Sequence, residues 1–148
     1  MKNVVIEWSY PKDIENILCD DTMQNVGLYY ITRNFGGNIS DLYIGKTIFS
    51  YKSRLEPHSK SWIDDYRGVK QVRLGEIVSH KSLSWENYSS LIDDVEKTLI
   101  WLMRDSLLHN IQCTKDCYPK HRLHIANIGY RGNLPSEMFF TDEEWYGE

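Results

Sequence analysis

Five side chains in the first part of the chain have the chemistry of an acid–base site that also binds an anion. Tyr29 and Tyr43 carry phenols, Lys46 and Arg54 carry positive charge, and His58 carries an imidazole. A phenol of ordinary pKa, about 10, takes up a proton poorly at neutral pH unless nearby cations favour the phenolate. Arginine also presents two donors to a phosphate, a geometry that lysine cannot copy. The set indicates proton transfer beside a bound anion, provided that the fold brings these side chains together.

Two short strands are expected to carry the tyrosines. The runs 28–32 and 42–45 are rich in β-branched and aromatic residues, and the residues between them include glycines, asparagines and a serine. This pattern predicts an antiparallel hairpin with a long loop. Because alternate side chains of a strand share a face, Tyr29 and Tyr43 can project to one side if the register permits.

Helical spacing marks the element that follows the hairpin. Tyr51, Arg54, Leu55 and His58 lie three or four residues apart, which predicts a short helix that presents Arg54 and His58 together. Residues 69–79 then alternate well enough for a third strand against the hairpin.

A long helix is expected over residues 85–108. Ser84 is a good N-cap for it, and an apolar stripe runs along one face through Leu91, Val95, Leu99 and Leu102. Glu96 lies one residue beyond Val95, at the edge of this stripe. A carboxylate there can face the sheet without being fully exposed.

The chain as a whole is expected to form a single domain. It has 148 residues, of which 26% are charged and 13% aromatic, a composition typical of folded globular proteins. We expect an α+β fold in which a small, mainly antiparallel three-stranded sheet is flanked by helices, with the core over residues 26–110. Residues 1–25 would be an N-terminal extension with a strand at 3–8, and residues 111–148 a C-terminal extension with a strand at 122–128 and an acidic tail.

In their order and spacing, these residues resemble the signature of the GIY-YIG nuclease family. The resemblance covers roughly residues 26 to 110, and leucine replaces the isoleucine of the first motif. The matching positions are Gly27-Leu28-Tyr29, Tyr43-Ile44-Gly45, Lys46, Arg54, His58, Glu96 and, for the family's asparagine, Asn110 or alternatively Asn127. The resemblance implies the fold of that family and a divalent-metal-dependent DNA endonuclease that hydrolyses phosphodiester bonds.

The resemblance also implies roles for individual side chains. One divalent ion, Mg²⁺ or Mn²⁺, would be held by Glu96, by water and by phosphate oxygens. Tyr43 would accept the proton of the attacking water, Tyr29 would position that water or a phosphate oxygen, and His58 would relay the proton. Arg54 would bind the phosphate. The implied catalytic set is Tyr29, Tyr43, Lys46, Arg54, His58, Glu96 and Asn110.

Two other interpretations use the same residues. Gly45-Lys46-Thr47 matches the end of a phosphate-binding P-loop, but that loop requires a glycine where this chain has Ser40. The pattern therefore argues against a nucleotide hydrolase, and we expect no organic cofactor. The remaining alternative is a noncatalytic nucleic-acid-binding domain that keeps the same fold.

The charge distribution places positive charge around the motif. The net charge is −4, but residues 33–73 hold eight Lys or Arg against four Asp or Glu, a net +4, as a phosphate-facing surface requires. Trp62 and Tyr66 lie among these basic residues, either to stack on nucleic acid or as core contacts of a short helix. The residues expected to contact DNA are Lys52, Lys60, Arg67, Lys70 and Arg73.

The cysteine and histidine pattern leaves a metal site open. Cys113 and Cys117, followed by His121 and His124, could bind zinc, or they could be free cysteines and surface histidines. With Cys19 the chain has three cysteines, an odd count that favours a reducing cytoplasm over a disulfide framework. No apolar run is long enough to span a membrane, and the N-terminus lacks the pattern of a signal peptide.

Overall fold

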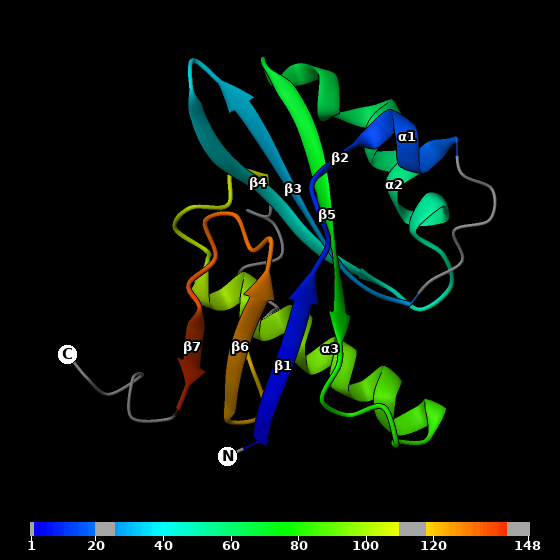
Figure 1. The fold of residues 1–148 in the computed structure, drawn as a ribbon, viewed down its shortest axis with the longest axis vertical. Helices are drawn as coiled ribbons and strands as arrows, with labels where there is room; N and C mark the ends of the chain where they lie inside the picture. Colours follow the sequence, from blue (N-terminus) through cyan, green and yellow to red (C-terminus); the bar gives the residue numbers. More distant parts are fainter. Residues whose placement is uncertain (1, 20–25, 110–117, 142–148) are drawn as a thin grey trace.

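The computed structural model of the protein describes residues 2–19, 26–109 and 118–141. Three α-helices and a curled sheet make up this part of the chain (Figure 1). The elements are β1 (Lys2–Trp8), β2 (Lys12–Asp13), α1 (Ile14–Leu18), β3 (Gly27–Phe35), β4 (Asn38–Thr47), α2 (Tyr51–Ser61), a 3₁₀ turn η1 (Ile63–Asp65), β5 (Val69–Ile77), α3 (Trp85–Leu102), β6 (Leu123–Gly129) and β7 (Glu137–Phe140).

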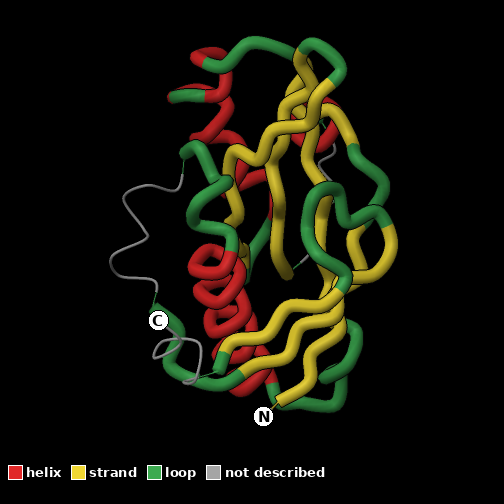
Figure 2. The backbone as a smooth tube through the Cα atoms, turned by 90° about the vertical axis from the view of Figure 1, so that its left-hand side faces the viewer, coloured by secondary structure: helices red, strands yellow, loops and turns green. Residues whose placement is uncertain are grey.

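The sheet is larger than expected and is mixed. Its strand order is β4-β3-β5-β1-β6-β7, with β2 pairing to β5. The hairpin of β3 and β4 forms, and β5 is the third strand against it, as expected. However, β1 pairs antiparallel with β5 and parallel with β6, so the sheet continues and curls (Figure 2). The expectation of a small three-stranded sheet is therefore wrong, because the segment 2–8 and the strands after α3 extend it.

Helices cover both faces of the sheet and create two cores. Leu28 and Tyr30 of β3 face α3, where Leu91, Val95 and Leu99 pack against β1 and β6. Tyr29 and Ile31, the alternate residues of β3, belong to a separate core with residues of α1 and α2. These two helices lie apart from α3 (Figure 1). Because β3 is buried on both faces, its side chains reach two environments. None of the helices that the structure describes is long and apolar enough to cross a membrane.

The hairpin between β3 and β4 is tight. Its loop consists of Gly36 and Gly37, which have φ angles of 62° and 83°, values that glycine adopts without strain. The prediction of a long loop is wrong, because the polar residues instead lengthen both strands and pair with one another at the exposed end of the hairpin. A register shift near Ile31 leaves Leu42 without a partner in β3, so that Tyr43 lies opposite Ile31 and Asp41 opposite Thr32.

The helix α3 ends at Leu102, six residues before the expected end. The chain then turns back along the outer edge of β4, where the backbone N–H of Leu108 donates to Asp41 (3.1 Å) and that of His109 to Leu42 (2.9 Å). Leu107 is buried against the α3 core, which explains why the apolar pattern continued past the real end of the helix. This turn places His109 beside β4.

Candidate active site

The residues singled out in the sequence meet where β3, β4 and α2 come together. The Tyr29 and Tyr43 rings are stacked with centroids 6.0 Å apart, which confirms that they share a face of the hairpin. The His58 ring lies 5.8 Å from the Tyr29 ring and 4.5 Å from the Tyr43 ring. The helix α2 contributes this histidine because Ser50 caps its first turn by accepting from the Ser53 N–H, and Tyr51 and Leu55 bury its inner face.

A glycine makes room for the Tyr29 phenol. Gly45 lies opposite Tyr29 in the β3–β4 register. A Cβ atom at position 45 would lie 2.4 Å from both Cζ and Oη of Tyr29. Since Tyr29 is fully buried, the phenol has little space into which it can retreat. The glycine of the second motif therefore sets the position of the tyrosine of the first.

Replacing Gly45 with alanine is expected to displace the Tyr29 hydroxyl and to lower the free energy of unfolding by about 1–3 kcal/mol, the usual cost of overpacking. Denaturant unfolding and NMR signals of the His58 ring would measure the two effects. Gly27→Ala is a matched control, because its Cβ would meet the Gly75 carbonyl and the Tyr51 hydroxyl instead. It should destabilise the fold with His58 signals unchanged. Unaltered stability and His58 signals in Gly45→Ala would contradict this account.

His58 is hydrogen-bonded on both ring nitrogens. Its Nε2 lies 2.9 Å from the Tyr29 hydroxyl, and its Nδ1 accepts from the indole N–H of Trp62 at 2.8 Å. Burial, with smaller contributions from the charges of Arg54 and His109, lowers the pKa of His58 to about 4. At neutral pH this imidazole is therefore uncharged.

Arg54 is exposed on α2, and its charge acts on the two tyrosines, on His58 and on Glu96. Burial raises the pKa of Tyr29 well above its ordinary value, and the nearby Tyr43 adds to this effect, while the charge and a hydrogen bond of Arg54 lower it. Burial and Glu96 raise the pKa of Tyr43, whereas Arg54 and a hydrogen bond from Tyr29 lower it. Arg54 is thus the cation that favours either phenolate.

Glu96 reaches the same group of side chains from α3. Burial raises the pKa of Glu96 to about 7, and the Asp93 carboxylate also raises it; the charges of Lys46 and Arg54 and a hydrogen bond with the Lys46 backbone lower it. Arg54 and Glu96 therefore lie within electrostatic reach of each other. A partly buried carboxylate beside a second one, Asp93, fits a divalent ion, and Mg²⁺ is commonly held by one or two carboxylates with water completing its shell.

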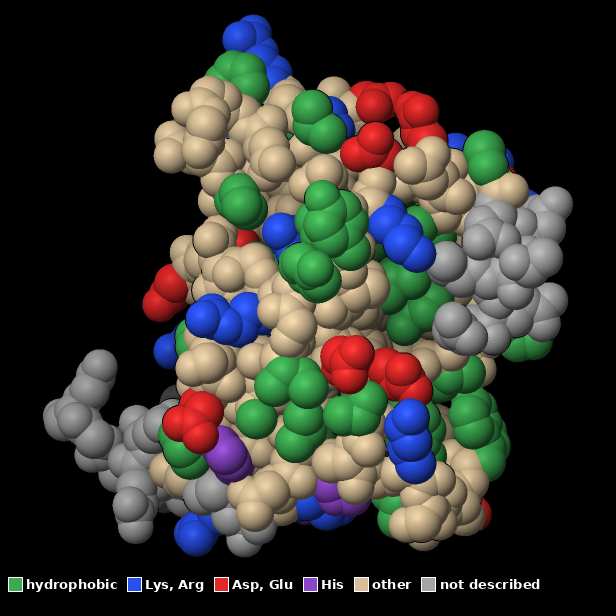
Figure 3. Space-filling model, viewed as in Figure 1, with side chains coloured by type: hydrophobic (Ala, Val, Ile, Leu, Met, Phe, Trp, Pro, Cys, Tyr) green, Lys and Arg blue, Asp and Glu red, His purple; other side chains and the backbone are tan. Residues whose placement is uncertain are grey.

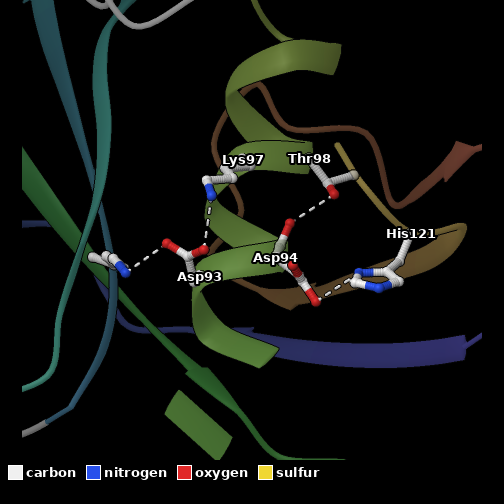
Figure 4. Close-up of polar contacts among 6 residues, drawn as sticks. Asp93, Asp94, Lys97, Thr98 and His121 are labelled. Carbon is white, nitrogen blue, oxygen red and sulfur yellow. Dashed lines mark hydrogen bonds and ion pairs between the residues drawn. The ribbon is translucent and has the colours of Figure 1, made fainter. Parts of the chain in front are cut away.

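Lys46 is engaged by a carboxylate that sequence reasoning missed. Its Nζ lies 2.7 Å from Asp93, which also pairs with Lys97 at 2.9 Å (Figure 4). Although burial raises the pKa of Asp93, the hydrogen bonds from the two lysines outweigh it and lower the pKa below the ordinary value. Asp93 precedes Glu96 by three residues, a helical spacing that could have indicated that the two carboxylates share a face.

An aromatic wall formed by Trp62, Tyr66 and His109 borders the site. The His109 ring is stacked on Trp62 with centroids 3.8 Å apart, and its Nδ1 lies 3.2 Å from the Tyr66 hydroxyl. Trp62 is 7% exposed and belongs to the core beneath α2, so the core-contact interpretation holds for this ring. Sequence reasoning missed His109, because only the backbone pairing of residues 108–109 with β4 brings it here.

The five residues expected to contact DNA do not form one open basic surface. Arg73 is 6% exposed, and its guanidinium donates to Thr32 (2.9 Å) and lies over the Tyr30 ring. In this position it is not accessible to a phosphate, contrary to the expectation. Lys60 pairs with Glu56, and Lys70 donates to the Tyr66 carbonyl. Arg67 is exposed, and Lys52 is partly exposed. On the face shown in Figure 3, basic and acidic side chains are interspersed.

The remaining candidates lie elsewhere or outside the described residues. Asn110 is outside them, as are Cys113 and Cys117. Asn127 is buried, and its amide accepts from the Trp8 indole (2.9 Å) and donates to the Pro135 carbonyl (2.8 Å), so it supports the β6 region.

The two histidines of the possible zinc site have acidic partners. His121 pairs with Asp94 (Figure 4) and His124 with Glu137. Within residues 2–19, 26–109 and 118–141, no three His, Cys, Asp or Glu side chains are grouped to hold a metal ion.

Comparison of the chain with protein-family models, with curated proteins and with solved structures found no significant match.

Proposed function

We propose that the protein is a metal-dependent DNA endonuclease of the GIY-YIG type. The observation that supports this most is the convergence on Arg54. Its charge acts on Tyr29 of β3, Tyr43 of β4, His58 of α2 and Glu96 of α3. Phosphodiester hydrolysis needs an acceptor for the proton of water and positive charge at the phosphate. An exposed arginine close to two phenols, an imidazole and a partly buried carboxylate supplies these requirements in one place.

Substrate binding is assigned to Arg54. Because it is exposed, its guanidinium can direct two N–H groups at the scissile phosphate. Lys46 is already paired with Asp93, so its charge acts on Glu96 and on the phosphate from a fixed position.

Proton transfer is assigned to Tyr43. The attacking water gives its proton to the Tyr43 oxygen as its own oxygen bonds to phosphorus, and the bond from phosphorus to the 3′ oxygen breaks. The 3′ oxygen then takes a proton from solvent, which leaves a 3′-hydroxyl and a 5′-phosphate. Burial and Glu96 raise the pKa of Tyr43, and Arg54 and the hydrogen bond from Tyr29 oppose this rise and favour the phenolate that the step needs.

Glu96, with Asp93 as its neighbour, is the carboxylate that would hold a divalent ion. Such an ion supplies positive charge at the scissile phosphate and at the departing oxygen. The residue contributes a carboxylate whose pKa is raised to about 7 mainly by burial, with Asp93 adding to the effect and Lys46 and Arg54 opposing it.

The protein is expected to nick or linearise supercoiled plasmid in the presence of Mg²⁺. Cleavage should stop when EDTA removes the ion, and excess Mg²⁺ should restore it. The assay needs low salt, because phosphate binding weakens steeply as salt rises. Gel electrophoresis of the plasmid measures the outcome. A retained gel shift with no cleavage in Mg²⁺ or Mn²⁺ would contradict the endonuclease and favour the noncatalytic nucleic-acid-binding domain.

A further inference from the structure

The hydrogen bond from Trp62 to His58 determines which nitrogen of the imidazole carries the proton. An indole nitrogen is a donor only, so the Trp62 N–H, 2.8 Å from His58 Nδ1, requires that Nδ1 accept. A neutral imidazole has one N–H, which must then be on Nε2. The groups that face this ring are Tyr29 on β3, Tyr43 on β4, Arg54 on α2 and His109 beyond α3, and none of them is a carboxylate. His58 is therefore neutral, with Nε2 as its donor.

The tautomer of His58 determines which partner is the donor in each of the neighbouring hydrogen bonds. His58 Nε2 lies 2.9 Å from the Tyr29 oxygen, so Nε2–H donates and the Tyr29 oxygen accepts. The hydroxyl hydrogen of Tyr29 is then free to be donated, and its hydrogen bond with the stacked Tyr43 favours the Tyr43 phenolate. Each group thus donates a hydrogen bond to the next one: Trp62 to His58, His58 to Tyr29, and Tyr29 to the Tyr43 oxygen. With the reverse tautomer, Tyr29 would have to donate to His58 and could not donate to Tyr43.

We propose that Trp62 is a positioning residue, whose indole N–H fixes the Nε2–H tautomer of His58 so that the donor chain ends on the Tyr43 oxygen. Its part in cleavage rests on the proposed endonuclease function, but the tautomer itself does not. On this proposal His58 acts as a fixed donor rather than a proton relay. Trp62 is given no contact with the phosphate or the attacking water on this proposal, and it acts through its hydrogen bond to His58.

The surroundings of Trp62 hold its indole in place. The ring is stacked on His109 at an interplanar angle of 13°, meets the Tyr66 edge at 88°, and is 7% exposed. Water therefore has little access to replace the indole as donor to Nδ1. A phenyl ring at position 62 keeps most of this packing and removes only the N–H.

The first test is NMR of the labelled full chain without DNA or metal. Long-range ¹H–¹⁵N correlation should show a protonated Nε2 and an unprotonated Nδ1 for His58 in the wild type. In Trp62→Phe this preference should be lost, and the pKa of His58 should rise by about one unit, because a donor no longer faces Nδ1. Trp8→Phe is the matched control, since it removes another buried indole donor, to Asn127, outside the site. A wild-type His58 protonated on Nδ1, or signals unchanged in Trp62→Phe, would overturn the proposal.

The second test is cleavage kinetics. Trp62→Phe should lower kcat by about ten- to a hundredfold, the usual effect of removing a supporting hydrogen bond, with KM unchanged. His58→Ala, which removes the donor to Tyr29, should lower kcat at least as much as Trp62→Phe. Adding Trp62→Phe to His58→Ala should lower kcat little further, because Trp62 acts through its hydrogen bond to His58. An altered tautomer with unchanged kcat, or losses that multiply in the double variant, would overturn the proposed catalytic part. If the wild type does not cleave DNA, the endonuclease proposal fails, but the NMR spectrum of the wild type still determines the tautomer of His58. The same spectrum determines the tautomer if Trp62→Phe does not fold.

Discussion

Arg54→Ala is expected to slow plasmid cleavage by about 100- to 1000-fold, the usual effect of removing one preorganised donor from a charged transition state. The variant loses both the donors to the phosphate and the cation that lowers the pKa of Tyr29 and Tyr43. It also loses a charge that lowers the pKa of His58, so His58 should titrate at higher pH. Single-turnover cleavage in Mg²⁺ at low salt, followed on gels, measures the rate, and NMR titration measures the histidine.

The fold should tolerate this change. Arg54 is exposed, so its removal should alter the free energy of unfolding by no more than about 0.5 kcal/mol. Arg54→Lys keeps the charge without the paired donors and should recover only part of the rate. The matched control is Arg104→Ala, which removes an exposed arginine just after α3 and should cut DNA at a rate close to that of the wild type. Equal cleavage by Arg54→Ala and the wild type would mean that the site is misplaced or that the activity belongs to a contaminant.

Local patterns in the sequence predicted the elements that carry the tyrosines, Arg54 and His58. Alternation and turn residues identified β3, β4 and β5, and helical spacing identified α2 and the start of α3. These signals depend on neighbours within a few residues, which a sequence displays directly. They extended to the shared face of Tyr29 and Tyr43, because strand alternation determines which side chains can project to the same side.

Pairing between distant segments could not be read in the same way. The strand β1 pairs in parallel with β6, joining Lys2 to Leu123 and Trp8 to Gly129. Neither segment has a local sequence pattern that identifies the other as its pairing partner, so the sheet was expected to end at β5. The indole of Trp8 against Gly75, where a Cβ would lie 2.7 Å from the ring, is a fit that only the assembled sheet reveals.

The same limit applies to the site. Glu96 was expected near the tyrosines through the family resemblance, whereas Trp62 and His109 joined the site through packing that the sequence does not display. Arg73 was assigned to a phosphate-facing surface from segment charge, but its place on β5 puts it against Thr32 and Tyr30. Net charge of a segment carries no information on which side chains turn inward.

Glu96→Gln is expected to stabilise the protein without metal at pH 8 by about 1–3 kcal/mol while abolishing cleavage. The pKa of Glu96 is raised from about 4.5 to about 7 in the folded chain. Between these values the folded state keeps a proton that the unfolded state has released, so the stability of the wild type falls as pH rises from about 4.5 to about 7. Glutamine has no charge to bury and should not show this loss. Urea unfolding of both proteins from pH 4.5 to 8 measures the difference, which should shrink towards pH 4.5.

With Mg²⁺ present, we expect the wild type to be more stable than Glu96→Gln. A divalent ion that binds the ionised Glu96 stabilises the folded wild type by mass action, and Glu96→Gln should gain little from it. Thermal unfolding at pH 8 with and without Mg²⁺ separates the two, and needs no DNA. Glu86→Gln, which removes an exposed carboxylate from the first turn of the same helix, should follow the wild type in both experiments. A Glu96→Gln variant that is less stable than the wild type at pH 8 without metal, or that gains as much from Mg²⁺, would show that this carboxylate is held by other partners and does not bind the ion.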